Sequence, residues 1–114
     1  MIDTQEKIFK ALSDKNRLRI IKMLQKKPLC VCEIRDILNL AVSTVSKHLS
    51  ILRDAGFICD SKDGKWINYR INPLPGKEVS NALIYIQLQL EDDKIIKKDR
   101  MLIERVDRNI LCCK

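Results

Sequence analysis

The apolar residues of this chain repeat at two different periods, and the order of those periods constrains the fold more than any other feature. From Ile8 to Leu52 they recur every three or four positions, as in an amphipathic helix. After Gly56 the period falls to two, which is typical of a β-strand. It returns to the helical value after Gly76. The sequence therefore predicts a mainly α-helical chain with one β-hairpin.

Polar residues and breakers divide the first half of the chain into four helices. Two short helices precede Pro28, and Ser13-Asp14 is expected to supply the N-cap of the second of them. A third helix is expected over residues 31–38. The fourth is expected to begin at Val42 or at Ser43, which can serve as its N-cap, and to end near Ala55 because a glycine follows.

The second half is expected to hold the hairpin and one long amphipathic helix. The hairpin should cover about residues 58–71, with its tight turn at Asp63-Gly64. Residues 72–76 form a linker rich in proline. The helix should cover about residues 77–110, and it is interpreted as one helix or as two that are separated at Asp92-Asp93.

Two helices joined by a short turn and followed by a basic hairpin form the pattern of a winged helix-turn-helix. Here the helix-turn-helix would cover about residues 31–55 and the wing about 58–71. Small polar and basic side chains of the second helix can reach bases and phosphates, and lysines flank the hairpin turn. A solvated helix face is the alternative interpretation. The candidate DNA-binding residues are Val42, Ser43, Thr44, Ser46, Lys47, Arg53, Lys62 and Lys65.

Charge and length are consistent with a small nucleic-acid-binding protein. The formal charge of +7 over 114 residues favours a polyanionic partner. We expect one domain over residues 1–110 and a cysteine-containing tail over 111–114. No secretory signal or membrane span is expected, which favours the cytoplasm and no membrane partner. No catalytic constellation or cofactor loop is visible, so neither an enzyme nor an organic cofactor is predicted.

Five cysteines, an odd number, favour thiols used for metal binding or redox chemistry over a disulfide framework. Cys30 and Cys32 lie at the start of the predicted helix-turn-helix. Positions i and i+2 of a helix diverge by roughly 200°, so both sulfurs can hold one ion only if the first turn opens. An ion bound there would favour the open form and disturb DNA contact. The pair thus predicts a switch that is controlled by a soft ion.

Four segments in this order resemble the ArsR/SmtB family of winged-helix, metal-responsive repressors: ALSDKNRLRIIKML, LCVCEI, STVSKHLSILRDAGFI and DGKWINYRI. The segment LCVCEI is similar to the arsenic- and antimony-responsive branch. The resemblance implies a homodimer built by terminal helices, with apolar stripes around Ile8 and from Val79 to Leu90 suited to that role. Burial of these stripes within one subunit is the alternative. It also implies an inverted-repeat operator that is released when As(III) or Sb(III) binds cysteine thiolates.

Trivalent arsenic and antimony favour three thiolates in a pyramid, and Cys30 and Cys32 supply two. The family's pattern has a third cysteine three positions later, where this chain has Arg35. Cys112 and Cys113 can complete the site, form a separate vicinal-dithiol site, or have no role. Cys59 is interpreted as a small buried hydrophobe. The only histidine, His48, is expected to have a structural or DNA-supporting role. A single histidine disfavours a zinc site.

Two other functions remain open at this point. Cys112 with Cys113, or Cys30 with Cys32, could act as redox partners in a repressor that responds to thiol oxidation. A cytosolic carrier that transfers a soft ion through its vicinal cysteines is the second alternative.

Overall fold

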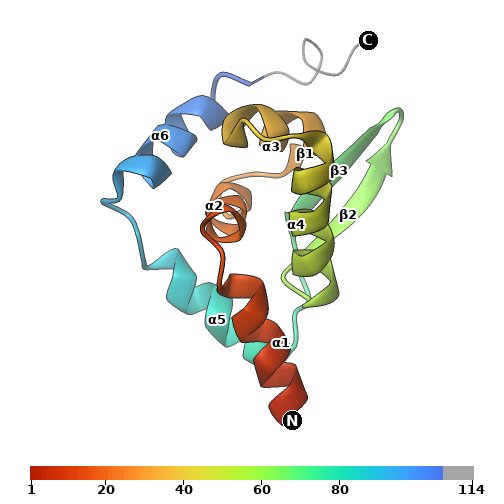
Figure 1. The fold of residues 1–114 in the computed structure, drawn as a ribbon, viewed down its shortest axis with the longest axis vertical. Helices are drawn as coiled ribbons and strands as arrows, with labels where there is room; N and C mark the ends of the chain where they lie inside the picture. Colours follow the sequence, from red (N-terminus) through yellow and green to blue (C-terminus); the bar gives the residue numbers. More distant parts are fainter. Residues whose placement is uncertain (107–114) are drawn as a thin grey trace.

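The computed structural model describes residues 1–106, and they form six helices and three short strands (Figure 1). The mainly α-helical class with a hairpin wing is confirmed. The elements in chain order are α1 (Ile2–Leu12), α2 (Lys15–Leu24), β1 (Leu29–Cys30), α3 (Val31–Leu38), α4 (Val42–Asp54), β2 (Ile58–Asp63), β3 (Trp66–Ile71), α5 (Lys77–Gln87) and α6 (Lys94–Ile103).

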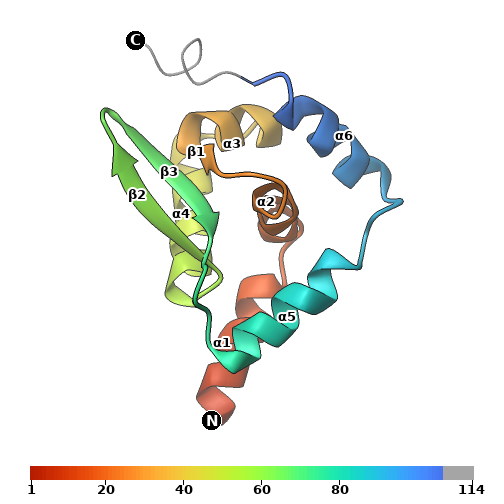
Figure 2. The same ribbon diagram turned by 180° about the vertical axis from the view of Figure 1, so that it is seen from behind.

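The helix α2 lies at the centre, and the other elements surround it in both views of the ribbon (Figures 1 and 2). Five residues in its second half are buried, more than in any other described helix. The helices α3 and α4, the strand β1 and the start of β2 contribute further apolar side chains. The most deeply buried core residues are Ile20, Ile21, Met23, Leu29, Ile34, Val45, Leu49, Leu52, Phe57 and Ile58.

Short polar side chains and glycine begin and end these helices, though not always where the sequence suggests. The Asp14 carboxylate accepts hydrogen bonds from the backbone N–H groups of Asn16 and Arg17, so the predicted cap of α2 is confirmed. The expected Ser43 cap of α4 is wrong. The N-cap is Ala41, in extended backbone two residues earlier, which leaves Ser43 exposed inside the first turn.

The wing is an antiparallel hairpin of β2 and β3, paired from Ile58↔Ile71 to Asp63↔Trp66. Its two turn residues are therefore Gly64 and Lys65, not Asp63 and Gly64 as the sequence suggested. Gly64 has φ +62°, which a tight hairpin turn of this kind needs at its first central position.

A third strand, β1, pairs antiparallel with the other edge of β3, giving the sheet order β1-β3-β2. Its two residues pair as Leu29↔Tyr69 and Cys30↔Asn68. The sequence did not predict this strand, because two residues are too few to show a period of two. The strand joins the start of α3 to the wing.

The expected break in the C-terminal helical region is confirmed. It separates α5 from α6 over residues 88–93, and Asp93 caps α6 by accepting from the N–H groups of Ile95 and Ile96. The break turns α6 back onto α2. There Arg19 Nε and Nη2 donate to the two carboxylate oxygens of Asp99, each at 2.9 Å.

Asp99→Ala is expected to destabilise the fold by about 3 kcal/mol, because it leaves the half-buried Arg19 guanidinium without its carboxylate. Urea unfolding monitored by circular dichroism measures the change. Asp92→Ala, in the exposed loop before α6, is the matched control and should change stability little. Equal losses of unfolding free energy in the two variants would show that the Arg19–Asp99 ion pair does not stabilise the packing of α6 on α2.

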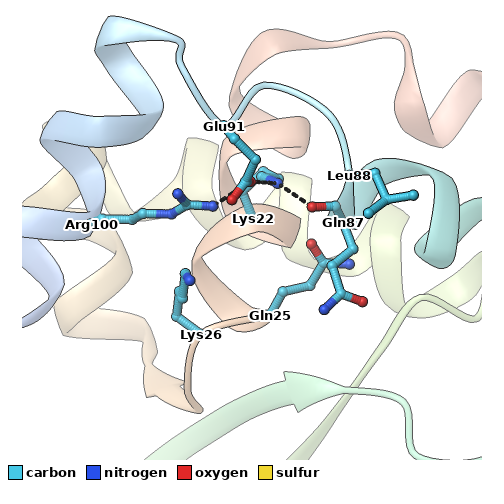
Figure 3. Close-up of a pocket in the computed structure, with 7 residues that line it drawn as sticks. All are labelled: Lys22, Gln25, Lys26, Gln87, Leu88, Glu91 and Arg100. Carbon is cyan, nitrogen blue, oxygen red and sulfur yellow. Dashed lines mark hydrogen bonds and ion pairs between the residues drawn. The ribbon is translucent and has the colours of Figure 1, made fainter.

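A second ionic link involves Glu91, whose carboxylate accepts from both Lys22 on α2 and Arg100 on α6 (Figure 3). Hydrogen bonds from Arg100 and then from Lys22 lower the pKa of Glu91 from its ordinary value of 4.5 to about 2. A carboxyl with a lowered pKa stabilises the folded state above its unfolded pKa, and this contribution is lost as the pH falls through the folded value.

Glu91→Gln should therefore lower the urea midpoint most near neutral pH and progressively less between pH 4.5 and about 2. Midpoints of the variant and the unsubstituted protein, measured across that range, provide the test. A difference that stayed constant with pH would show that the Glu91 charge does not contribute.

Candidate DNA interface and thiol site

The first two turns of α4 form an exposed polar surface. Val45, Leu49 and Leu52 are buried and hold one face of α4 against the core. The opposite face is therefore presented to solvent, as a recognition helix requires. Exposed in these first two turns are the five residues that the sequence predicted near the helix start: Val42, Ser43, Thr44, Ser46 and Lys47.

The side chain of His48 fixes α4 relative to the first two helices. Arg17 Nη1 lies 3.0 Å from His48 Nδ1, and Arg17 Nε donates to the Ala11 carbonyl at 2.8 Å. The Asp14 carboxylate lies 4.0 Å from His48 Nε2. These contacts agree with the structural role predicted for His48, and they hold the exposed face of α4 at a defined angle.

The predicted residue Arg53 lies away from the other α4 candidates. It is ten positions beyond Ser43, about 15 Å along the helix axis. Its Nη1 donates to Asp60 on β2 at 3.1 Å, so it already has an anionic partner. The structure therefore does not bring Arg53 together with the polar residues at the start of α4.

The hairpin extends from the body of the molecule, and Figure 1 shows its tip beyond the helices. Lys65 is a turn residue and Lys62 lies near the end of β2, and both are exposed. The Lys65 ammonium lies over the Trp66 ring, 5.1 Å from its centroid. Cations held at the end of a projecting hairpin are suited to contact phosphates.

Cys30 occupies the junction of two elements, being the last residue of β1 and the N-cap of α3. Its backbone N–H donates to Glu33 Oε1 at 2.9 Å, and its side chain accepts from the Glu33 backbone N–H. It is fully buried, and burial raises the pKa of its thiol. A protonated, buried thiol binds a soft ion only after the junction opens.

Cys32 lies in the first turn of α3 and is half-buried. It is in a disulfide bond, whereas Cys59 on β2 is a free thiol. Cys112 and Cys113 lie outside the described residues. Within residues 1–106, no three His, Cys, Asp or Glu side chains are grouped to hold a metal ion.

Glu33 is the residue of this site that the sequence interpretation missed. Its carboxylate closes the start of α3 by accepting from the Cys30 N–H. The signal was present, since a small polar residue followed by glutamate three positions later is the spacing of a capping box. Cysteine in place of the usual serine or threonine concealed it.

The apolar stripes that the resemblance assigned to dimerisation divide into two sets. Ile8, Val79, Leu83 and Ile86 are buried within this one chain. A second set of apolar side chains on α1 and α5 stays exposed, and both ribbon views place these helices beside each other (Figures 1 and 2). The exposed residues are Ile2, Phe9, Ile84, Tyr85 and Leu88, at 58–81%.

Solved structures share this fold. The homodimeric winged helix-turn-helix DNA-binding domain Mb0332 from Mycobacterium bovis is 26% identical, with a TM-score of 0.65 over 75% of this chain and 77% of that chain. HlyU from Vibrio cholerae is 27% identical, with a TM-score of 0.63 over 74% and 88%. The fold and its exposed α4 and hairpin define a winged helix-turn-helix transcriptional regulator.

The sequence model described as "Bacterial regulatory protein, arsR family" matches residues 14–59. The Arsenic resistance transcriptional regulator ArsR2 of Pseudomonas putida is 33% identical over 96% of this chain and 98% of the relative. The protein belongs to the ArsR family of bacterial regulatory proteins, as the resemblance implied.

Two other relatives match a shorter segment. The Arsenical resistance operon repressor of Escherichia coli is 40% identical over 58% of this chain and 57% of the relative. The Cadmium resistance transcriptional regulatory protein CadC of Listeria innocua is 45% identical over 55% and 54%. The chain thus spans little more than half the length of these two relatives. Among the described residues no helix is long and apolar enough to cross a membrane.

Proposed function

We propose that this protein is a transcriptional repressor that leaves its operator when trivalent arsenic or antimony binds Cys30 and Cys32. The observation that carries the proposal is the position of Cys30, which both caps α3 of the helix-turn-helix and ends the strand paired to the wing. Two relatives named for arsenic resistance support the choice of ion. A cytoplasmic location would keep its thiols reduced.

Operator contact would be divided between bases and phosphates. Ser43, Ser46 and Lys47 would read base edges in the major groove from the first turns of α4. Lys62 and Lys65 on the wing would contact phosphates, which fix the register of the protein on the duplex. Val42 and Thr44 are also exposed in the first turn of α4 and would contact the DNA from either side of these residues. Arg53 would contact a phosphate only by sharing or leaving Asp60.

Metalloid capture would open the start of α3. Cys30 and Cys32 are two positions apart and diverge while that turn is helical, so one ion can bridge both sulfurs only after the turn unwinds. Unwinding would break the hydrogen bond from the Cys30 N–H to Glu33. It would also pull Cys30 from its pairing with Asn68 on β3. Since β3 is a wing strand, the change would reach both α3 and the wing.

The third sulfur would come from Cys112 or Cys113, both outside the described residues. Two alternatives are that these two cysteines form a separate vicinal-dithiol site and that the tail has no role. Replacing both by serine distinguishes them, because As(III) release should weaken only if the tail donates a ligand.

The functional unit would be a homodimer built on α1 and α5. Both helices expose apolar side chains, Phe9 on α1 and Tyr85 on α5 among them. A second copy would bury them, and Mb0332 is a homodimer of the same fold. Two recognition helices would then enter successive major grooves about 34 Å apart on an inverted repeat.

Tyr85→Glu is expected to raise the dimer dissociation constant at least about tenfold, since it would bury an unpaired carboxylate. Sedimentation equilibrium measures the constant. Ile95→Glu is the matched control, because Ile95 is a similarly exposed apolar residue on α6. If Ile95→Glu dissociated the dimer and Tyr85→Glu did not, the interface would lie on α6.

A repressor that responds to thiol oxidation is the second candidate, and the disulfide at Cys32 favours it. Peroxide alone would then release the operator, without metalloid. A soft-ion carrier has no such support, because the relatives and structural neighbours named above are regulators or DNA-binding proteins.

Fluorescence anisotropy with a labelled fragment of the promoter upstream of the gene tests the DNA-binding half of the proposal. Because lysines and helix N-termini would hold phosphates, affinity should fall steeply as salt rises. A nearly flat salt dependence would contradict the assigned lysine contacts, and no specific complex would contradict the repressor proposal.

A further inference from the structure

Two side chains at the C-terminal end of α2 donate hydrogen bonds to the last turn of α5. The Lys22 ammonium donates to the carbonyls of Ile86 and Gln87, at 3.1 and 3.2 Å. Gln25, the C-cap of α2, donates from Nε2 to the Leu83 carbonyl at 3.1 Å. The last turn of α5 carries no basic residue of its own, so Lys22 supplies positive charge at the negative end of its helix dipole. The end of α5 is therefore held by α2.

The Lys22 ammonium is buried, and each of its three N–H groups has an acceptor. Its remaining N–H donates to the Glu91 carboxylate in the loop after α5, as Figure 3 shows. Only 3% of Lys22 is exposed, and a buried ammonium is costly unless it is paired. Lys22 therefore favours the one arrangement of α2 and α5 in which all three bonds form.

These bonds fix the orientation of α5 more closely than its apolar contacts do. Within residues 1–106, Lys22 and Gln25 are the only side chains of other elements that hydrogen-bond to α5. Val79, Leu83 and Ile86 pack the helix on the core. Apolar burial is not directional, whereas a hydrogen bond weakens steeply when it is misaligned. The two α2 side chains therefore determine the rotation of α5 about its own axis.

The turn of α5 that α2 holds is also the turn that exposes part of the proposed dimer surface. Ile84, Tyr85 and Leu88 are 58–73% exposed there. They lie along the chain between and beside the residues whose carbonyls accept from Lys22 and Gln25. A rotation of this turn would redirect all three apolar side chains, and with them the angle at which one copy meets the other.

The first half of α2 contacts the recognition helix. Arg17 Nη1 lies 3.0 Å from His48 Nδ1 on α4. Lys22 is five positions after Arg17, about 7.5 Å further along the axis of α2. One short helix thus joins α4 near its beginning and α5 near its end. The angle between the recognition helix and the proposed dimer surface depends on both of these links.

We propose that Lys22, together with Gln25, is a positioning residue that sets which spacing of operator half-sites this protein accepts. The inference rests on the proposed function, in which two copies meet at α1 and α5 and each α4 enters a major groove. One base pair added between the half-sites displaces them by about 3.4 Å and rotates them by about 35° around the DNA axis. A dimer in which α5 is fixed to α2 resists this displacement, whereas a dimer in which α5 can rotate tolerates it.

The test compares two duplexes that differ only in spacing, namely the operator with its own spacer and the same operator with one base pair added. Both compete with the labelled promoter fragment at a protein concentration at which sedimentation shows every variant to be dimeric. The result is the ratio of the two affinities. A variant that is merely less stable would bind both duplexes less tightly and keep this ratio, whereas a variant in which α5 rotates would lower it.

Two variants loosen the end of α5, and one is the control. Lys22→Met removes the three N–H groups and keeps an unbranched side chain. Gln25→Met is milder, since it removes only the bond to the Leu83 carbonyl, and it decides the test if Lys22→Met does not fold. Lys26→Met is the matched control, because Lys26 is exposed just after α2 and its loss changes the net charge as Lys22→Met does.

We expect the unsubstituted protein to prefer its own spacer at least about tenfold, because the longer operator must be twisted to fit. Lys22→Met should lower this ratio at least about threefold, Gln25→Met should lower it less, and Lys26→Met should leave it unchanged. An unchanged ratio in both Lys22→Met and Gln25→Met, or an equal fall in Lys26→Met, would overturn the inference. Absence of any spacer preference in the unsubstituted protein would instead contradict the proposed dimeric contact with the operator, and the inference with it.

Discussion

Cys30→Ser is expected to leave operator affinity unchanged within about threefold while it abolishes release by As(III). Serine is a strong N-cap residue, so its hydroxyl can keep the hydrogen bond from the Glu33 N–H that the Cys30 side chain now accepts. A neutral hydroxyl is a poor ligand for a soft trivalent ion. Loss of an outer-shell partner already costs about 10–100-fold in metal affinity, and loss of a ligand should cost at least about 100-fold.

Cys32→Ser should give the same result, because it removes the other thiolate of the pair. Cys59→Ser is the matched control, since Cys59 is a half-buried free thiol on β2 and not at the start of α3. Anisotropy of the labelled promoter during an As(III) titration measures all three variants. Release that persists in Cys30→Ser, or disappears in Cys59→Ser, would place the sensing site elsewhere.

The second large effect is expected at the recognition helix. Replacing Ser43, Ser46 and Lys47 together by alanine should weaken operator binding at least a hundredfold, roughly 3 kcal/mol, at constant salt. These side chains are exposed and pack against no part of the core, so the fold should remain intact. Binding to unrelated DNA should change much less, because serine contacts to base edges carry sequence information and phosphate contacts do not.

A double variant of the wing gives the contrasting result. Lys62→Gln with Lys65→Gln should weaken operator and unrelated DNA by similar factors and should lower the salt slope by about two. The recognition-helix variant should lower that slope by no more than about one, since it removes one lysine. If the wing variant lost specificity and the recognition-helix variant did not, the roles proposed for α4 and the wing would be reversed.

Elements whose limits are encoded locally were predictable from the sequence. Asp14 starts α2 and Asp93 starts α6 through side-chain hydrogen bonds between near neighbours in the chain. A glycine with φ +92° follows the end of α4. These signals depend on one or two residues, so no tertiary information was needed to find them.

Features that depend on contacts between distant segments were not predictable. The strand β1 exists because Leu29 and Cys30 meet β3 some forty positions later. Which residues of the apolar stripes are buried within the chain was not predictable either. One helix buries Leu83 and exposes Tyr85 two positions later. Periodicity identifies an apolar face but does not identify what covers it.

The residues of the candidate site were predictable from the sequence, but the physical link between the cysteine pair and the wing was not. The cysteine pair and the polar start of α4 could be named from the sequence, and the structure leaves the residues at the start of α4 exposed. The link between Cys30 and the wing through Asn68 required the sheet register. This link gives a physical route by which an ion bound at α3 would alter DNA contact.

Anisotropy of the labelled promoter fragment, titrated under reducing conditions with As(III), Sb(III), Zn(II) and phenylarsine oxide, tests the central claim most directly. As(III) or Sb(III) is expected to release the DNA, whereas Zn(II) is expected to leave the complex intact. Release by phenylarsine oxide alone would show that only two sulfurs are available. A specific complex that none of the four compounds disturbs would contradict metalloid control.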